Sequence, residues 1–241
     1  MRRLFSTIAI LFAINIAMLA QDDVASSIEV ADSIKDELSL PKQRRVTEFM
    51  GIPIDGTKKE MIKQLKKKGF RHNYTEPGAL KGEFNGQEVY VFIHTNKDKK
   101  VWRIALTDVV ATNESDIKIK FNNLCRQFNS NNKYFPQSKV ENYVIPNDES
   151  ISYNMTMRGK RYDANFCQCL DTHLMYSRNI HLLKMETEKE SEEFTSMIGL
   201  FLDYLAYNQV WFTIYKEDYK PKYRIVLYYE NGKKQDLGKD L

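Results

Sequence analysis

A repeated hairpin pattern is the feature that most restricts how this chain can fold. Residues 89–107 align with residues 210–228 without a gap, and six of the nineteen pairs are identical. Ordinary composition gives roughly one identity in an alignment of this length. Apolar residues alternate within each segment, which is the period of a half-buried β-strand. We therefore expect two equivalent antiparallel hairpins, and the match favours an internal duplication over convergence of two hairpins.

The alternation also predicts which side chains of the two hairpins are buried. Trp102, Ile104 and Leu106 should share one face of the first hairpin, as Tyr223, Ile225 and Leu227 should in the second. We expect each hairpin to belong to its own antiparallel sheet, covered by its own helix. The pairs expected to be equivalent in burial are Val89 and Val210, Val91 and Phe212, Ile93 and Ile214, Ile104 and Ile225, and Leu106 and Leu227.

Local signals place the two helices and two further turns. Thr57 and Glu60 form a capping-box pattern, and the helix that they begin should end at Gly69. A second helix begins at Ser115, and five apolar residues at helical spacing give it one buried face: Ile117, Phe121, Leu124, Cys125 and Phe128. Asn85-Gly86 predicts a tight hairpin turn. Arg158-Gly159 suggests another hairpin, between residues 151–157 and 161–170.

This order of elements predicts an α+β fold made of two tandem repeats, each a helix packed on an antiparallel meander. The first repeat covers residues 46–110 and the second covers residues 111–241, with a helical insertion at about 171–208. Residues 186–207 should form its helix, because acidic residues precede apolar residues at helical spacing. That helix either belongs to the core, which we favour, or is offered to a partner.

The first twenty residues have the pattern of a secretory signal peptide. Arg2 and Arg3 precede an apolar run that ends at Ala20, and polar residues follow at once. We expect cleavage between Ala20 and Gln21, and an uncleaved membrane anchor is the alternative. Residues 21–45 should form a flexible leader. The mature chain is then exported to the periplasm or the outside and has no transmembrane segment.

Charge argues against a nucleic-acid partner. Loss of Arg2 and Arg3 with the signal peptide lowers the formal charge from +4 to +2, which is nearly balanced. A strongly basic domain or a basic stripe is typical of nucleic-acid binding. The two dense basic runs, residues 63–68 and 97–100, are expected at a helix end and in a turn, where they form solvated surface.

Three cysteines follow the expected signal peptide, and an oxidising compartment allows them to pair. Cys167 and Cys169 are two residues apart on a predicted strand, so a bridge between them would be strained. We expect one bridge from Cys125 to Cys167 or Cys169, and three buried thiols are the alternative. Cys167, Cys169 and His173 also form a C-x-C-x3-H cluster, but it lacks the C-x2-C spacing of soft-metal sites. We therefore expect no metal.

The helix opening Gly56-Thr57-Lys58-Lys59-Glu60 and the order helix, strands, helix, strands resemble the tandem-repeat architecture of the beta-lactamase-inhibitor-like proteins. Each repeat also resembles the small outer-membrane assembly lipoproteins. Residues 49–56 and 223–229 are similar to segments of exported Gram-negative bacterial proteins of unknown function. The resemblance implies an exported protein of tandem helix-plus-sheet repeats and supplies no activity. The lipobox cysteine is missing, so the resemblance does not extend to a tethered assembly role.

No established catalytic motif is present in the sequence. We find no phosphate loop, dinucleotide fingerprint, zinc-protease helix or nucleophile elbow. His94, His173 and His181 with Asp163 or Glu83 are the available acid–base residues, and no spacing links them. We therefore assign no catalytic, cofactor-binding or metal residue, and we do not expect an enzyme.

The abundance of aromatic residues favours binding as the function. The chain has 14 Tyr and 13 Phe, and several of them must be partly exposed. We expect a non-enzymatic secreted or periplasmic binding protein of the cell envelope, which holds a protein or peptide on a sheet face or on the helix at 186–207. A structural envelope protein and a hydrolase with an unrecognised site are the alternatives.

Overall fold

The computed structural model describes residues 46–169, 207–218 and 220–235. The chain divides into two compact units, Val46–Gln168 with Leu205–Leu241 and Met1–Arg45 with Cys169–Tyr204. Apart from Cys169, the described residues belong to the first of these units, and the fold given below is the fold of that unit.

Several expectations fall outside the described residues. They are the signal peptide at 1–20, the leader at 21–45, and all but the last two residues of the insertion at about 171–208. The predicted helix at 186–207 is outside them except for Tyr207. These expectations stay predictions.

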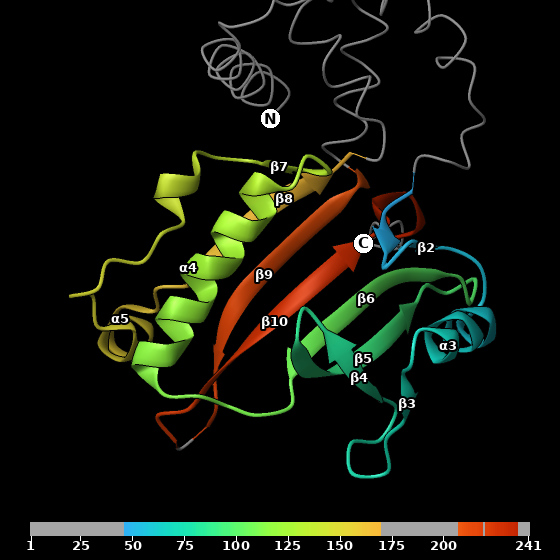
Figure 1. Ribbon diagram of the computed structural model, residues 1–241, viewed down its shortest axis with the longest axis horizontal. Coiled ribbons are helices and arrows are strands. Elements are labelled where there is room, and N and C mark those ends of the chain that lie inside the picture. Colours follow the sequence, from blue (N-terminus) through green and yellow to red (C-terminus); the bar gives the residue numbers. More distant parts are fainter. Residues whose placement is uncertain (1–45, 170–206, 219, 236–241) are drawn as a thin grey trace, which may run out of the picture. The chain divides into compact units, whose positions relative to one another are not determined.

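An eight-stranded antiparallel sheet forms the body of the described unit (Figure 1). Its strand order is β3-β4-β5-β6-β10-β9-β8-β7. The strands are β3 (Arg71–His72), β4 (Leu80–Phe84), β5 (Gln87–Thr95), β6 (Val101–Asp108), β7 (Tyr134–Pro136), β8 (Asp163–Gln168), β9 (Gln209–Lys216) and β10 (Tyr223–Glu230). A separate two-stranded sheet consists of β1 (Glu48–Phe49) and β2 (Ile52–Pro53).

The α-helices of the described unit are α3 (Lys58–Lys67), α4 (Glu114–Ser130) and α5 (Ile151–Arg158). Two 3-10 turns, η2 (Val140–Asn142) and η3 (Gly232–Lys234), complete the elements. The expected α+β class is therefore confirmed. None of the helices in the described ranges is both long enough and apolar enough to cross a membrane.

The two hairpins belong to one sheet, so the expectation of two separate sheets is wrong. Strand β6 pairs with β10 in an antiparallel seam, in which Leu106 lies opposite Leu227. Two separate meanders would each expose the unpaired backbone of a long, apolar edge strand. The seam removes both of these edges and leaves the short strands β3 and β7 at the outside of the sheet.

The expected equivalence in burial of the five aligned pairs is confirmed. In the first hairpin Val91 lies opposite Leu106, and in the second Phe212 lies opposite Leu227, which are the aligned positions. The ten residues expected to be equivalent are all at most 7% exposed. The Asn85-Gly86 turn is also confirmed, since both residues have the positive φ angles (52° and 72°) of a tight primed turn.

Trp102 departs from this equivalence because β5 and β6 contain a bulge. The register shifts between His94 and Thr95, which makes Trp102 the extra residue of the bulge. Val101 takes the fully buried place that Tyr223 has in β10, and Trp102 is only half-buried. The prediction that Trp102 and Tyr223 occupy equivalent places is therefore wrong.

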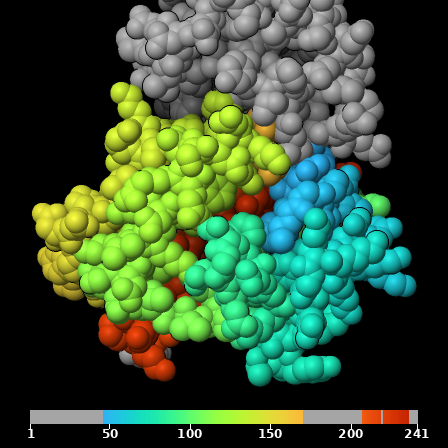
Figure 2. All heavy atoms as spheres, in the orientation of Figure 1, coloured from blue at the N-terminus to red at the C-terminus, as the bar shows by residue number. Residues whose placement is uncertain are grey.

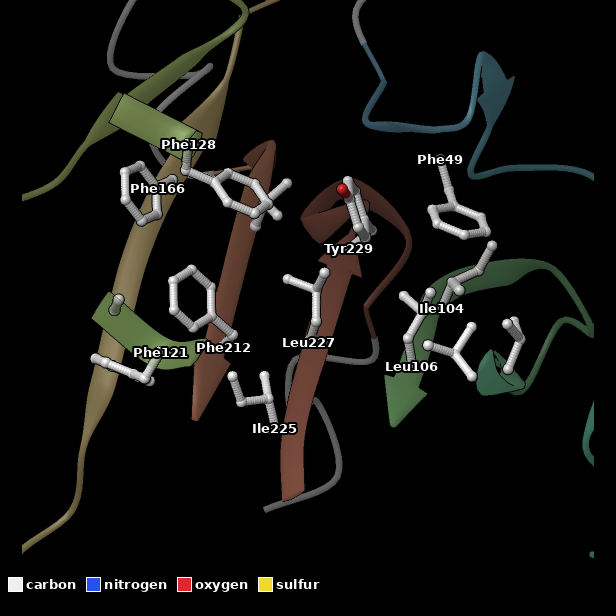
Figure 3. Packing of buried hydrophobic residues seen from close by; sticks show 14 of the residues in the cluster. Phe49, Ile104, Leu106, Phe121, Phe128, Phe166, Phe212, Ile225, Leu227 and Tyr229 are labelled. Atoms are coloured by element: carbon white, nitrogen blue, oxygen red, sulfur yellow. The ribbon is translucent and has the colours of Figure 1, made fainter. Parts of the chain in front are cut away.

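Helices α3 and α4 form where the sequence signals place them. The Thr57 hydroxyl accepts from the Glu60 N–H, and the Glu60 carboxylate accepts from the Thr57 N–H, which is the predicted capping box. Asn113 caps α4, which therefore begins at Glu114, one residue before the expected start at Ser115. Both helices bury their apolar sides in one core with the same face of the sheet, where Phe121 of α4 packs against Phe212 of β9 (Figure 3).

Residues 151–158 form helix α5 and not the first arm of a hairpin, so that prediction is wrong. The Ser150 side chain caps the helix, and Gly159 ends it in the left-handed conformation (φ 62°). Ile151 and Met155 lie one helical turn apart and face the core. The second arm is confirmed as strand β8, which pairs with β7 and β9.

The segment before α3 is held against strands β8, β4 and β10. Gln168 of β8 accepts from the Glu48 N–H (2.6 Å) and donates to the Glu48 carbonyl (2.9 Å), so it clamps the backbone on both sides. Phe49 is fully buried and contacts the rings of Phe84 and Tyr229 at 5.2–5.4 Å between centroids. Residues 48–49 therefore close one end of the core over the seam.

The disulfide expected from Cys125 does not form. Cys125 is a buried thiol on the side of α4 that faces the sheet, and burial raises its pKa to about 12. Phe166 of β8 points to the same side, since it contacts Phe128 of α4. Successive residues of a strand point to opposite faces, so Cys167 lies on the far side of the sheet from Cys125. Cys167 and Cys169 are also buried.

Candidate functional site

A groove lies in the covered face of the sheet, at the seam between β6 and β10. Helix α4 packs over β7 and β10, and α3 packs over β5, so neither helix covers the seam (Figure 1). Phe49 fills one end of this gap, and the rest of the gap forms the groove. Figure 2 shows the resulting hollow between α4 and the β4–β5 hairpin, with atoms of β10 visible at its bottom.

The floor of the groove is apolar and its volume is about 360 Å³. This volume lies in the range of about 300–1,000 Å³ that is typical of ligand sites. Four side chains of the central strands form the floor: Val89, Leu106, Ile225 and Leu227. Figure 3 shows Leu106, Ile225 and Leu227 side by side on this surface. Each is at most 4% exposed, so the floor is shaped by tightly packed core residues.

Carboxamide side chains line both walls. Asn85 and Gln87 come from the β4–β5 turn, and Asn123 and Gln127 come from α4, one helical turn apart. Each carboxamide offers a donor and an acceptor. Together they provide paired hydrogen-bonding groups above an apolar surface.

Polar contacts close both ends of the groove. Asn85 donates to Gln127 (2.7 Å), which joins the hairpin to α4 at one end. Lys120 of α4 forms an ion pair with Asp108 of β6 (2.7 Å) at the other end. The second carboxylate oxygen of Asp108 accepts from the Ile225 N–H, which fixes the floor to the same ion pair.

The acid–base residues that the sequence analysis considered are not brought together. His94 lies on β5 and Asp163 on β8, four strand spacings apart in the sheet, or about 19 Å. Glu83 lies on β4 opposite Glu88, far along the strand from His94. Burial, with the charges of Arg103 and Lys58, lowers the pKa of His94, so its ring is neutral at pH 7.

The other residues considered for chemistry lie largely outside the described chain. His173 and His181 are among them. The C-x-C-x3-H cluster is described only at Cys167 and Cys169, which are buried. Within the described ranges, no group of three or more His, Cys, Asp or Glu side chains has the arrangement of a metal site.

The groove could not be predicted from the sequence, because its walls come from segments far apart in the chain. Asn123 and Gln127 lie at the edge of the buried apolar stripe of α4, where polar residues are common and indicate no particular site. Ile119 was a detectable signal, since it is apolar, lies off the buried stripe of α4 and is 58% exposed beside the groove. A large apolar residue at such a position indicates a surface that is available for contact.

Comparison of the chain with models of protein families, with curated protein sequences and with solved structures finds no match.

Proposed function

We propose that this chain is a non-enzymatic binding protein, exported to the cell envelope, and that its groove holds an extended segment of a protein partner. The observation that carries the proposal is the combination of an apolar floor with carboxamides on both walls. An extended peptide has this chemistry, because its backbone alternates N–H and C=O groups while its side chains alternate in direction.

The floor explains how such a segment would gain affinity. An apolar side chain placed on Leu106 and Leu227 removes its own apolar surface from water, at about 25 cal/mol per Å². The groove is short, because the Asn85–Gln127 and Lys120–Asp108 contacts close it. It therefore suits one or two apolar side chains and the backbone between them.

Export is the second part of the proposal and rests on residues 1–20. A new N-terminus at Gln21 in protein isolated from the envelope is the expected result, and mass spectrometry measures it. Recovery of the chain with Met1 intact would contradict cleavage.

We also infer that the two strand groups, β3–β6 and β7–β10, arose by duplication. Each follows a helix, and their last hairpins pair in the same register at the aligned positions. A duplication explains the groove, since each copy would bring a helix for its own strands and neither would cover the seam.

Site-specific photo-crosslinking tests the binding proposal. A photoreactive amino acid replaces Asn123 in the groove wall, and the matched control replaces Asn129, which is exposed on the same helix but does not line the groove. In intact host cells the first position should crosslink to one protein, at an extended segment that contains an apolar residue. Equal crosslinking from both positions, or none from Asn123, would show that the groove is not a binding site. A processed small molecule in the same cells would favour the hydrolase alternative.

A further inference from the structure

A second hollow lies on the face of the sheet opposite to the one on which α3 and α4 pack. One row of this face is fixed by the strand registers, which place Asn165, Trp211, Tyr228, Ala105 and Phe92 side by side across five strands. The hollow has a volume of about 360 Å³ and lies at the Trp211 end of this row. We call it the polar hollow.

The ionic groups of the polar hollow balance each other. Arg103 pairs with Glu230 (2.6 Å), and Arg161 lies 3.4 Å from Asp163. Two cations and two anions give no net charge, so the hollow has no electrostatic preference for an anion or a cation. A neutral ligand with many hydrogen-bonding groups fits this balance best.

Two ionic side chains that line the hollow each have a buried atom without a hydrogen-bond partner in the described structure. They are Nε of Arg103, a donor, and Oδ1 of Asp163, an acceptor. Three carboxamides that can both donate and accept complete the lining: Asn165, Gln209 and Gln235. A hydroxyl group both donates and accepts, so neighbouring hydroxyls suit this mixture of groups better than a ligand with acceptors alone.

Trp211 supplies a fixed apolar surface in the same hollow. Its ring stacks on Tyr228 with 4.1 Å between centroids and 19° between planes. Its Nε1–H donates to Glu230 (2.8 Å), and Glu230 is in turn held by Arg103. The guanidinium of Arg103 also lies over the Tyr228 ring, 5.1 Å from its centroid. The indole is therefore held in place before any ligand arrives.

We propose that the polar hollow binds a neutral carbohydrate. A sugar ring combines adjacent hydroxyls, no charge and an apolar C–H face. The hydroxyls match the polar lining, the absence of charge matches the balanced ionic groups, and the C–H face matches the indole of Trp211. This proposal goes beyond the binding of a protein segment in the groove and is independent of it, because the two sites lie on opposite faces of the sheet.

NMR titration of the full exported chain tests the proposal. The chain has only two tryptophans, so the indole N–H signal of Trp211 is assigned by comparison with Trp102→Phe. The probes are glucose, galactose, mannose and N-acetylglucosamine with their disaccharides, and glucuronate is the charged comparison. At least one neutral sugar should shift the Trp211 signal to saturation, and glucuronate should bind no more tightly than glucose.

Two variants connect binding to the hollow. Asp163→Asn keeps the shape of the side chain and should weaken the binding of the neutral sugar about tenfold, because an ionic acceptor is lost. Tyr215→Ala removes an exposed aromatic residue from the same face of β9 outside the hollow and should leave the affinity unchanged. No shift of the Trp211 signal with any sugar, tighter binding of glucuronate, or equal affinity of the folded Asp163→Asn variant would overturn the proposal.

Discussion

Ile104 and Ile225 occupy neighbouring strands of one core, and the groove makes their environments different. Ile104 on β6 is fully buried and does not line the groove. Ile225 on β10 is 4% exposed and forms part of the groove floor. Substituting each isoleucine by alanine therefore tests whether the groove floor is open. The same atoms are removed in both cases, from a closed site at Ile104 and from an open site at Ile225.

The expected free-energy costs follow from this difference. Each substitution removes three carbon atoms, which costs about 2.4 kcal/mol at about 0.8 kcal/mol per buried CH₂. At Ile104 the truncation leaves an enclosed cavity on the order of 70 Å³. This cavity adds about 1.7 kcal/mol to the cost in unfolding free energy, at about 24 cal/mol per Å³. The total is about 4 kcal/mol. At Ile225 the new space merges with the groove and water enters it, so the cost should stay near 2.4 kcal/mol.

Urea denaturation of the purified chain measures both costs as differences in the free energy of unfolding, provided that the slope m is unchanged. Ile119→Ala is the matched control, because this isoleucine is 58% exposed and its truncation should change stability by less than about 0.5 kcal/mol. Equal costs at Ile104 and Ile225 would refute the open floor. An unchanged midpoint at either position would mean that the register of that strand is wrong.

Three further predictions concern single side chains. Gly82→Ala should destabilise the fold by about 1–3 kcal/mol in urea, because a Cβ there would lie 2.4 Å from the Phe70 ring. Cys125 should resist alkylation at pH 8 in the native state and react after unfolding, because burial raises its pKa to about 12; peptide mass spectrometry detects this. Burial alone would raise the pKa of Glu149, but hydrogen bonds from Lys160 and Tyr162 lower it below 4.5. The carboxylate therefore stabilises the fold above pH 4.5, and the melting temperature of Glu149→Gln should approach that of the wild type as pH falls further.

Local sequence signals predicted those parts of the fold that depend on a few neighbouring residues. The capping box of α3 needs only Thr57 and Glu60, and the β4–β5 turn needs only two residues that accept positive φ. Gly159 shows the limit of such signals. Its φ of 62° suits a hairpin turn and a helix end equally well, and only the cap at Ser150 and the burial of Ile151 decide for the helix.

Features that depend on contacts between distant segments could not be predicted from the sequence. The bulge at Trp102 inserts one residue into a pattern that reads as regular alternation. The seam joins strands whose alternation gives no indication of which neighbour each will take. Both candidate sites depend on that seam, since it forms the floor of the groove and brings Arg103 beside Glu230.

The β6–β10 seam also sets the order in which this chain can complete its sheet. Strands β3 to β6 are close together in sequence and can pair soon after they emerge. Their long edge β6 must wait for β10, which is the last of the described strands. Contacts over such a separation form late, because a long loop has to close first. Until then β6 presents unpaired backbone beside apolar side chains, which is a template for pairing with another chain. A chain truncated before Tyr223 is therefore expected to self-associate through β6.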